Sequence, residues 1–152
     1  MQRLQTLLCI TVALASVHLD TSAQDLSVVH AARDGETARV SDLLDTGQRA
    51  NTPQPDGATA LHWAAHWDDS AMANELLAAG ADVDAANDFG VVPLWLAALN
   101  GSASMVHTLL MAGANVNAAL PSGETVLMTA SRTGDVTAVS LLVSHGANIN
   151  TR

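Results

Sequence analysis

The sequence lacks residues on which several classes of protein depend. It has no lysine and no tyrosine, and its one cysteine is Cys9. A single cysteine excludes a disulfide within the chain, so packing alone must hold the fold together. Six arginines face fifteen aspartates and glutamates, which leaves a net charge of −9. Because phosphate contacts need clustered cationic side chains, this balance argues against nucleic acid as a partner and against an anionic membrane surface.

Long hydrophobic runs are also missing, except near the N-terminus. Residues 4–17 are mostly apolar, follow Arg3 and precede small residues at 21–23. This order is typical of a secretory signal peptide, which we expect to span residues 1–23; an uncleaved N-terminal helix packed on the fold is the alternative. The run is too short and too rich in Thr and Ser for a permanent membrane anchor. Export would leave a cysteine-free domain at residues 24–152, periplasmic or secreted.

What the chain does have is a period of 33 residues. Two sets of glycines repeat at this step: Gly57, Gly90 and Gly123, and Gly80, Gly113 and Gly146. The first set begins the similar segments GATALHWAA, GVVPLWLAA and GETVLMTAS. A fixed period of this size indicates a stack of one small unit. We expect four units, at about residues 24–53, 54–86, 87–119 and 120–152.

Each unit is predicted to contain two short helices. Thr59 and Thr125 stand where a hydroxyl would cap the first helix, and Pro93 occupies a first helical position. Leucine pairs at helical spacing give the second helix an apolar stripe, and Gly80 and its equivalents should end it. A turn containing Asn, Asp and Gly then projects as a finger. Stacking would bury apolar faces that no single unit could bury alone.

The two ends of the stack differ in this prediction. The first unit carries polar residues for an outer face: Gln24, Asp25, Ser27 and Arg33. The last unit continues the apolar pattern at four positions: Val136, Val139, Leu142 and Val143. We therefore expect that the sequence is truncated after Arg152, or that something else covers this end.

The motifs TALH at 59–62, VPLW at 92–95, and GADVDA and GANVNA at the unit ends resemble the ankyrin repeat family. The resemblance covers about residues 24–151. It implies an all-α solenoid of stacked helix–turn–helix units with β-turn fingers, used as a protein-recognition surface and not for catalysis. Only the unit at Thr59 keeps both the Thr and the His of the family motif, so we expect local repacking in the others. Asp68 stands where the family has glycine, which should strain the turn between the helices.

In such stacks, partners meet the finger tips and the last exposed residues of the first helices. Carried over by position, the finger residues are Asp56, Ala58, Asp88, Phe89, Val91, Ser122 and Glu124. The helix-end residues are Arg33, Asp34, His66, Trp67, Leu99, Asn100, Arg132 and Thr133. Trp67 and Phe89 are large aromatics in columns that ought to be exposed, as in binding hot spots, although Trp67 could instead fold back over the neighbouring unit. Trp63 and Trp95 are assigned to the core.

Signals for catalysis or metal binding are weak. The sequence contains no nucleophile elbow, phosphate-binding glycine loop or HExxH motif. His62 and His66 have the spacing of two zinc ligands, but no third ligand is evident. We expect a protein–protein interaction module without enzyme activity, metal or cofactor. One alternative is an N-terminal repeat arm of a longer secreted protein; another is an enzyme that binds a metal or small molecule.

Overall fold

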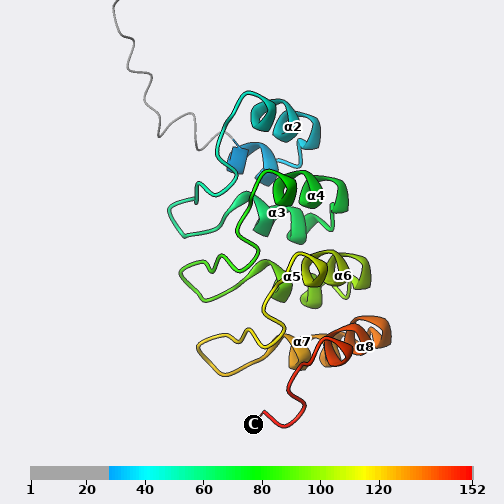
Figure 1. Ribbon diagram of the computed structural model, residues 1–152. Helices are drawn as coiled ribbons and strands as arrows, with labels where there is room; N and C mark the ends of the chain where they lie inside the picture. Colours follow the sequence, from blue (N-terminus) through cyan, green and yellow to red (C-terminus); the bar gives the residue numbers. More distant parts are fainter. Residues whose placement is uncertain (1–27, 152) are drawn as a thin grey trace, which may run out of the picture.

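The computed structural model describes residues 28–151, which form a stack of four layers (Figure 1). The first layer pairs the helical residues 28–33 with α2 (Thr37–Asp45). The other layers pair α3 (Ala60–Trp67) with α4 (Ser70–Ala78), α5 (Pro93–Leu99) with α6 (Ala103–Met111), and α7 (Val126–Thr133) with α8 (Val136–Ser144). The described residues contain no strand, only an isolated antiparallel bridge between Ala119 and Thr125. The predicted all-α solenoid is confirmed.

The predicted signal peptide at residues 1–23 lies outside the described residues, as do Cys9 and the polar residues Gln24, Asp25 and Ser27. Arg33, also expected on the polar outer face, is exposed and paired with Asp34 at 3.0 Å. Within residues 28–151, no helix is both long enough and apolar enough to cross a membrane.

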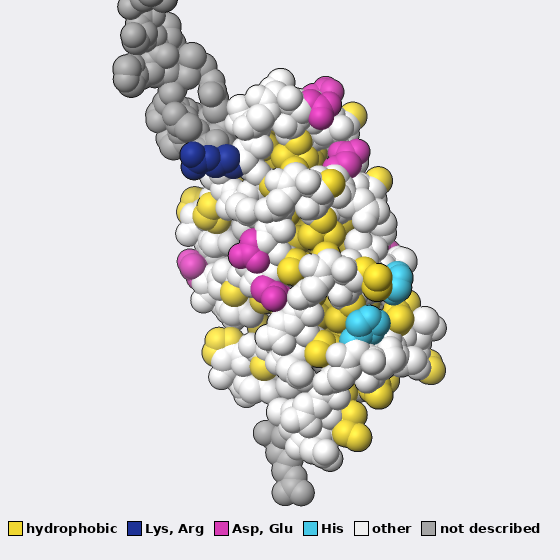
Figure 2. All heavy atoms as spheres, in the orientation of Figure 1, with side chains coloured by type: hydrophobic (Ala, Val, Ile, Leu, Met, Phe, Trp, Pro, Cys, Tyr) yellow, Lys and Arg dark blue, Asp and Glu magenta, His cyan; other side chains and the backbone are white. Residues whose placement is uncertain are grey.

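The helices stack in two parallel rows. The first helices contact one another from layer to layer, α3 with α5 and α5 with α7, and the second helices do the same through α4, α6 and α8. Fingers project from one side of this double row (Figure 1). Hydrophobic side chains show between successive layers on the face drawn in Figure 2. The chain therefore buries its apolar residues along the seams of a one-dimensional pile.

The core repeats with the sequence period. Fully buried alanines of the first helices allow the layers to approach closely: Ala64, Ala97 and Ala130. Fully buried leucines of the second helices fill the space between layers: Leu76, Leu109 and Leu142. Burial of a leucine side chain contributes about 1.5–3 kcal/mol. The same positions of each repeat are therefore buried in successive layers.

Helix starts follow the predicted capping residues and add a set that the sequence analysis missed. The Oγ1 atom of Thr125 accepts a hydrogen bond from the backbone N–H of Met128, and Thr59 and His62 form a capping box. Pro93 begins α5 as expected. The second helices have side-chain caps as well, supplied by Asp69, Ser102 and Asp135. Each cap satisfies an otherwise unpaired N–H at a helix start.

Two glycines of the fingers are required by close approach of the next finger. Gly57 has φ 81°, and a Cβ atom there would lie 3.0 Å from Cα of Asn87. Gly90 has φ 75°, and a Cβ atom there would lie 2.8 Å from Cδ of Pro121. Any larger residue would adopt an unfavourable left-handed conformation and collide with its neighbour as well. The fingers are therefore packed against one another.

Asp68 occupies the turn between α3 and α4 with φ 55°, and it is the one non-glycine residue with positive φ among those described. The strain expected from replacing the family glycine is therefore present. Its Oδ1 atom accepts a hydrogen bond of 2.5 Å from Oγ of Ser102 in the next layer. Its neighbour Asp69 instead accepts one of 2.5 Å from Oγ1 of Thr37 in the preceding layer. The two adjacent carboxylates therefore accept hydrogen bonds from different layers and are not paired with each other.

The last layer exposes apolar side chains on its outer side. Val136 is 76 % exposed, and Val143 and Ile149 are also exposed. The prediction is wrong for Leu142, which is fully buried because it packs into the core of the stack. Val139 is partly buried against the same core. The apolar pattern of α8 therefore serves both its own layer and an open outer face.

Candidate functional site

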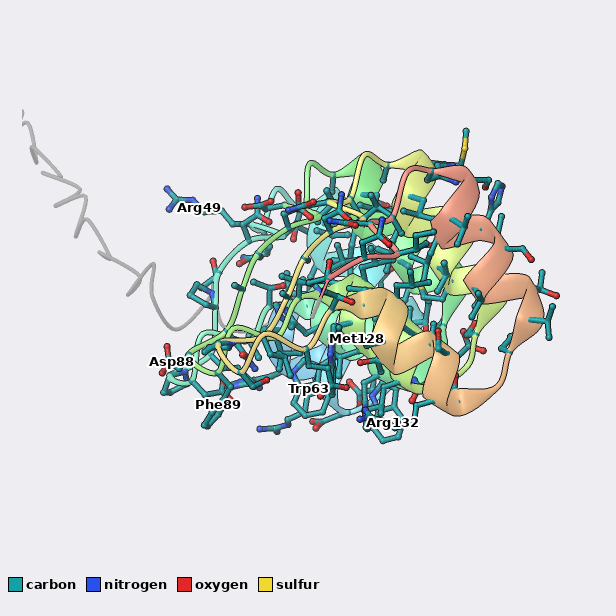
Figure 3. The ribbon with its side chains drawn as sticks, turned by 90° about the horizontal axis from the view of Figure 1, so that it is seen from below. Arg49, Trp63, Asp88, Phe89, Met128 and Arg132 are labelled. Carbon is teal, nitrogen blue, oxygen red and sulfur yellow. The ribbon has the colours of Figure 1, made fainter. Side chains whose placement is uncertain are left out.

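The predicted finger-tip and helix-end residues share one flank of the stack. Seen along the stack, Asp88, Phe89, Trp63 and Arg132 follow a single edge, and Arg49 points to the opposite one (Figure 3). Fingers and first helices line this edge because every layer repeats the same turn geometry. The structure therefore brings residues from different units onto one continuous surface.

Phe89 is presented by a tight turn at the tip of the finger that precedes α5. The Oδ1 atom of Asn87 accepts hydrogen bonds of 3.0 Å from the N–H groups of both Phe89 and Val91. The N–H of Asp88 donates a bond of 2.9 Å to the carbonyl of Asp56 in the neighbouring finger. Phe89 is consequently 69 % exposed on an ordered turn. Such a ring can bury its surface against a partner at little conformational cost.

A hollow of about 330 Å³ lies between the fingers that precede α3 and α5 and the two helices behind them. Four residues of its lining were predicted as site residues, namely Asp56, Ala58, His66 and Val91. The other four are His62, Trp63, Asn87 and Leu96. Ala58 is buried, although its finger position predicted exposure. It faces the hollow instead of standing at a finger tip.

Three rings of α3 form a row beside this hollow. The ring centroids of Trp63 and His66 lie 5.6 Å apart at an interplanar angle of 90°, and those of His66 and Trp67 lie 4.8 Å apart at 65°. Edge-to-face geometry of this kind is favourable for aromatic pairs. Trp63 and Trp95 are packed against the core but only partly buried, so their assignment to the core holds for part of each side chain.

His62 is a structural residue, with both ring nitrogens in hydrogen bonds. Its Nδ1 accepts from the N–H of Thr59 at 3.1 Å, and its Nε2 donates to the carbonyl of Val91 at 2.9 Å. These partners require the neutral ring, and burial lowers its pKa below the ordinary value of 6.5. A zinc ion shared with His66 would have to break one of these bonds. Among the described residues, no group of three or more His, Cys, Asp or Glu side chains could hold a metal.

Trp67 folds back onto the preceding layer, which is the alternative raised for it, and its side chain remains exposed. It is 52 % exposed, and its Nε1 donates a hydrogen bond of 3.1 Å to the carbonyl of Arg33. Asn100, its equivalent one layer later, donates bonds to the carbonyls of Ala65 and His66 at 3.0 and 2.9 Å. Thr133, two layers later, donates to the carbonyl of Ala98 at 3.4 Å. This column ties successive layers together, a role that the sequence analysis raised for Trp67 alone.

The charged helix-end residues are paired within the molecule. Arg132 forms an ion pair with Glu124, and Thr129 Oγ1 donates a bond of 2.7 Å to the same carboxylate. The Thr129 hydroxyl and then the Arg132 guanidinium lower the pKa of Glu124. Leu99 ends α5, the helix between α3 and α7, and is 43 % exposed. The flank therefore presents exposed apolar side chains next to paired charges.

The chain was compared with models of known protein families. The family model that describes ankyrin repeats, in three copies, matches residues 5–87 and again residues 69–152. The chain belongs to the ankyrin repeat family. The first match begins inside the segment for which a signal peptide is predicted. A search of curated proteins finds none that matches this chain. Ankyrin repeats generally mediate protein–protein interactions and are typically not enzymes.

Proposed function

We propose that this ankyrin repeat protein recognises a partner protein through the flank formed by its finger tips and first helices. The observation that carries the proposal is the exposure of Phe89, Trp67 and Leu99 on that one flank. Hot-spot residues at protein interfaces are enriched in aromatics that the surrounding contacts shield from water. Asp56, Asp88, His66 and Asn100 would supply the polar surroundings, with Glu124 and Arg132 at the lower end.

The partner would meet a preformed surface. The backbone N–H of Phe89 donates a hydrogen bond to Oδ1 of Asn87, and the indole N–H of Trp67 donates one to the carbonyl of Arg33. An ordered turn and an ordered indole lose less conformational freedom on binding, which leaves more of the contact energy as affinity. We further propose that this recognition takes place outside the cytoplasm, on the basis of the signal-peptide pattern at residues 1–23.

The proposal is tested by placing a photo-crosslinking amino acid at Phe89 in the source cells. A matched control places it at Met111, which is equally exposed but lies on the second helix α6. We expect a discrete crosslinked product from position 89 and none from position 111. Products only from position 111, or the same products from both positions, would contradict the proposal.

A second candidate is that the stack serves as a spacer or targeting arm of a longer secreted protein. The exposure of Val136, Val143 and Ile149 on the outer side of the last layer favours it. In that case a neighbouring segment would bury these side chains. Limited proteolysis of the protein purified from its source would then yield a stable fragment that retains this layer and carries additional residues beyond Arg152.

A further inference from the structure

The hollow between the fingers that precede α3 and α5 has a chemistry that stacking does not require. One layer later, the positions equivalent to Asp56, Trp63 and His66 are occupied by Phe89, Leu96 and Leu99. The backbone repeats in both layers, so either lining is compatible with the fold. The combination of a carboxylate, an indole and an imidazole at these positions is therefore not imposed by the repeat, and a ligand could account for it.

The aromatic part of the lining offers ring surface to a cation. Trp63 lines the hollow and contacts His66 edge to face at 5.6 Å. Its Nε1 donates a hydrogen bond of 3.3 Å to Oε1 of Gln54, which fixes the orientation of the indole. A cation placed over a tryptophan face is attracted by the ring quadrupole, and tryptophan is the best of the aromatic residues for this contact.

Two carboxylates lie at the same pair of fingers. Oδ1 of Asp56 accepts a hydrogen bond of 3.1 Å from the N–H of Ala58, which fixes the carboxylate at the lining of the hollow. Asp88 belongs to the next finger, and its Oδ1 lies 3.2 Å from the Cβ position of Gly57. Both aspartates are exposed. Their charges therefore add to one another at this pair of fingers.

Among the described residues, those that line the hollow include neither Lys nor Arg. Arg33 lines a neighbouring hollow that also includes Asp56, but its guanidinium pairs with Asp34 at 3.0 Å. Arg132, further along the flank, pairs with Glu124. His62 is held neutral by its two hydrogen bonds. With a net charge of −9 over the whole sequence, the hollow is complementary to a positively charged group.

We propose that this hollow binds an arginine side chain of the partner, an inference that rests on the proposed function. The guanidinium would stack on Trp63 and donate to the carboxylate of Asp56, because its planar fork suits both contacts. Its aliphatic stem would pack on Val91 and Leu96, which also line the hollow. The volume of about 330 Å³ is at the lower end of that of ligand sites, which suits one long side chain.

The probe for this proposal is N-acetylargininamide, compared with the neutral N-acetylcitrullinamide of nearly the same shape. Titration of ¹⁵N-labelled full-length protein is followed through the indole N–H resonances at low ionic strength, where exposed charges are least screened. We expect a saturable shift of the Trp63 resonance with the arginine compound. The citrulline compound should bind at least about tenfold more weakly, because it lacks the charge. Equal binding of both compounds, or no saturable shift, would overturn the proposal.

Substitution of Asp56 by asparagine isolates the charge. Asp56→Asn keeps an oxygen for the N–H of Ala58 and removes the carboxylate. It should weaken binding at least about fivefold, whereas Asp42→Asn, the same change on α2 outside the hollow, should leave it unaltered. Unaltered binding by Asp56→Asn would contradict the inference. Because the probe needs no partner, crosslinking from position 89 without arginine binding would leave the proposed function standing and overturn this inference alone.

Discussion

The Nε1 atom of Trp67 lies 3.1 Å from the carbonyl oxygen of Arg33 and donates a hydrogen bond across the seam between two layers. The same side chain is 52 % exposed on the flank that we propose for recognition. One residue thus joins the stack internally and presents a ring to the outside. Its two roles can be separated by substitution.

Trp67→Phe should remove the hydrogen bond and keep an aromatic surface. We expect a loss of about 0.5–1.5 kcal/mol in the free energy of unfolding, because one net hydrogen bond is lost. Partner binding should change little. Trp67→Ala should lower both stability and binding. Urea denaturation measures the first effect, and unaltered stability of Trp67→Phe would show that the bond to Arg33 contributes nothing.

Gly90→Ala should destabilise the finger stack more than Gly123→Ala does. Both glycines have positive φ, so both substitutions carry a backbone cost of about 1 kcal/mol. Only at Gly90 would the new Cβ atom lie 2.8 Å from Pro121, whereas Gly123 has open space around it. The difference in unfolding free energy between the two variants measures the contact between fingers. Equal losses would show that Pro121 moves aside freely.

His62 should make the stability of the protein depend on pH. Burial lowers its pKa in the folded state below 6.5, so the unfolded chain takes up a proton more readily. Stability is therefore highest above about pH 6.5 and falls as the pH decreases toward the lowered folded value. Further losses at lower pH are expected from Asp34 and Glu124, whose partners lower their pKa values below the ordinary 3.8 and 4.5.

The variant His62→Gln tests whether this pH dependence of stability comes from His62. It should be less stable than the parent near pH 7.5, since it loses the bonds to Thr59 and Val91, and its stability should vary less between about pH 6.5 and 5. His107→Gln, an exposed position on α6, should retain the parent profile. A parent profile that is flat across this range would contradict the lowered pKa.

Much of the fold could be predicted because the same residues recur every 33 positions. The glycine period located the layers. Thr125 and Pro93 marked helix starts, because the preference for such residues there depends only on the neighbouring backbone. The ties between layers could not be read in the same way. Trp67, Asn100 and Thr133 share only the ability to donate a hydrogen bond, so no residue identity marks their column. Whether such donors reach the preceding layer depends on the spacing between stacked helices.

A second set of ties had a visible signal. Asn51 accepts a hydrogen bond of 2.6 Å from the N–H of Asp82, and Asn117 accepts one of 2.8 Å from the N–H of Asn148. Asp84 does the same for Asn115 at 2.8 Å. These acceptors recur at the repeat step, so their similarity could have indicated a shared role. For the candidate site, the position of each residue within its repeat predicted that these residues share one flank. The burial of Ala58 and the ion pair of Glu124 could not be predicted, because they depend on packing between units.

The most direct test of recognition by this flank is the affinity for the crosslinked partner, measured by calorimetry for two matched variants. Phe89→Ala and Met111→Ala each remove a large apolar side chain that is 69 % or 68 % exposed. We expect Phe89→Ala to weaken binding by about 30-fold, equivalent to about 2 kcal/mol, and Met111→Ala to bind like the parent. Equal affinities for the parent and Phe89→Ala, or a loss confined to Met111→Ala, would show that this flank does not carry recognition.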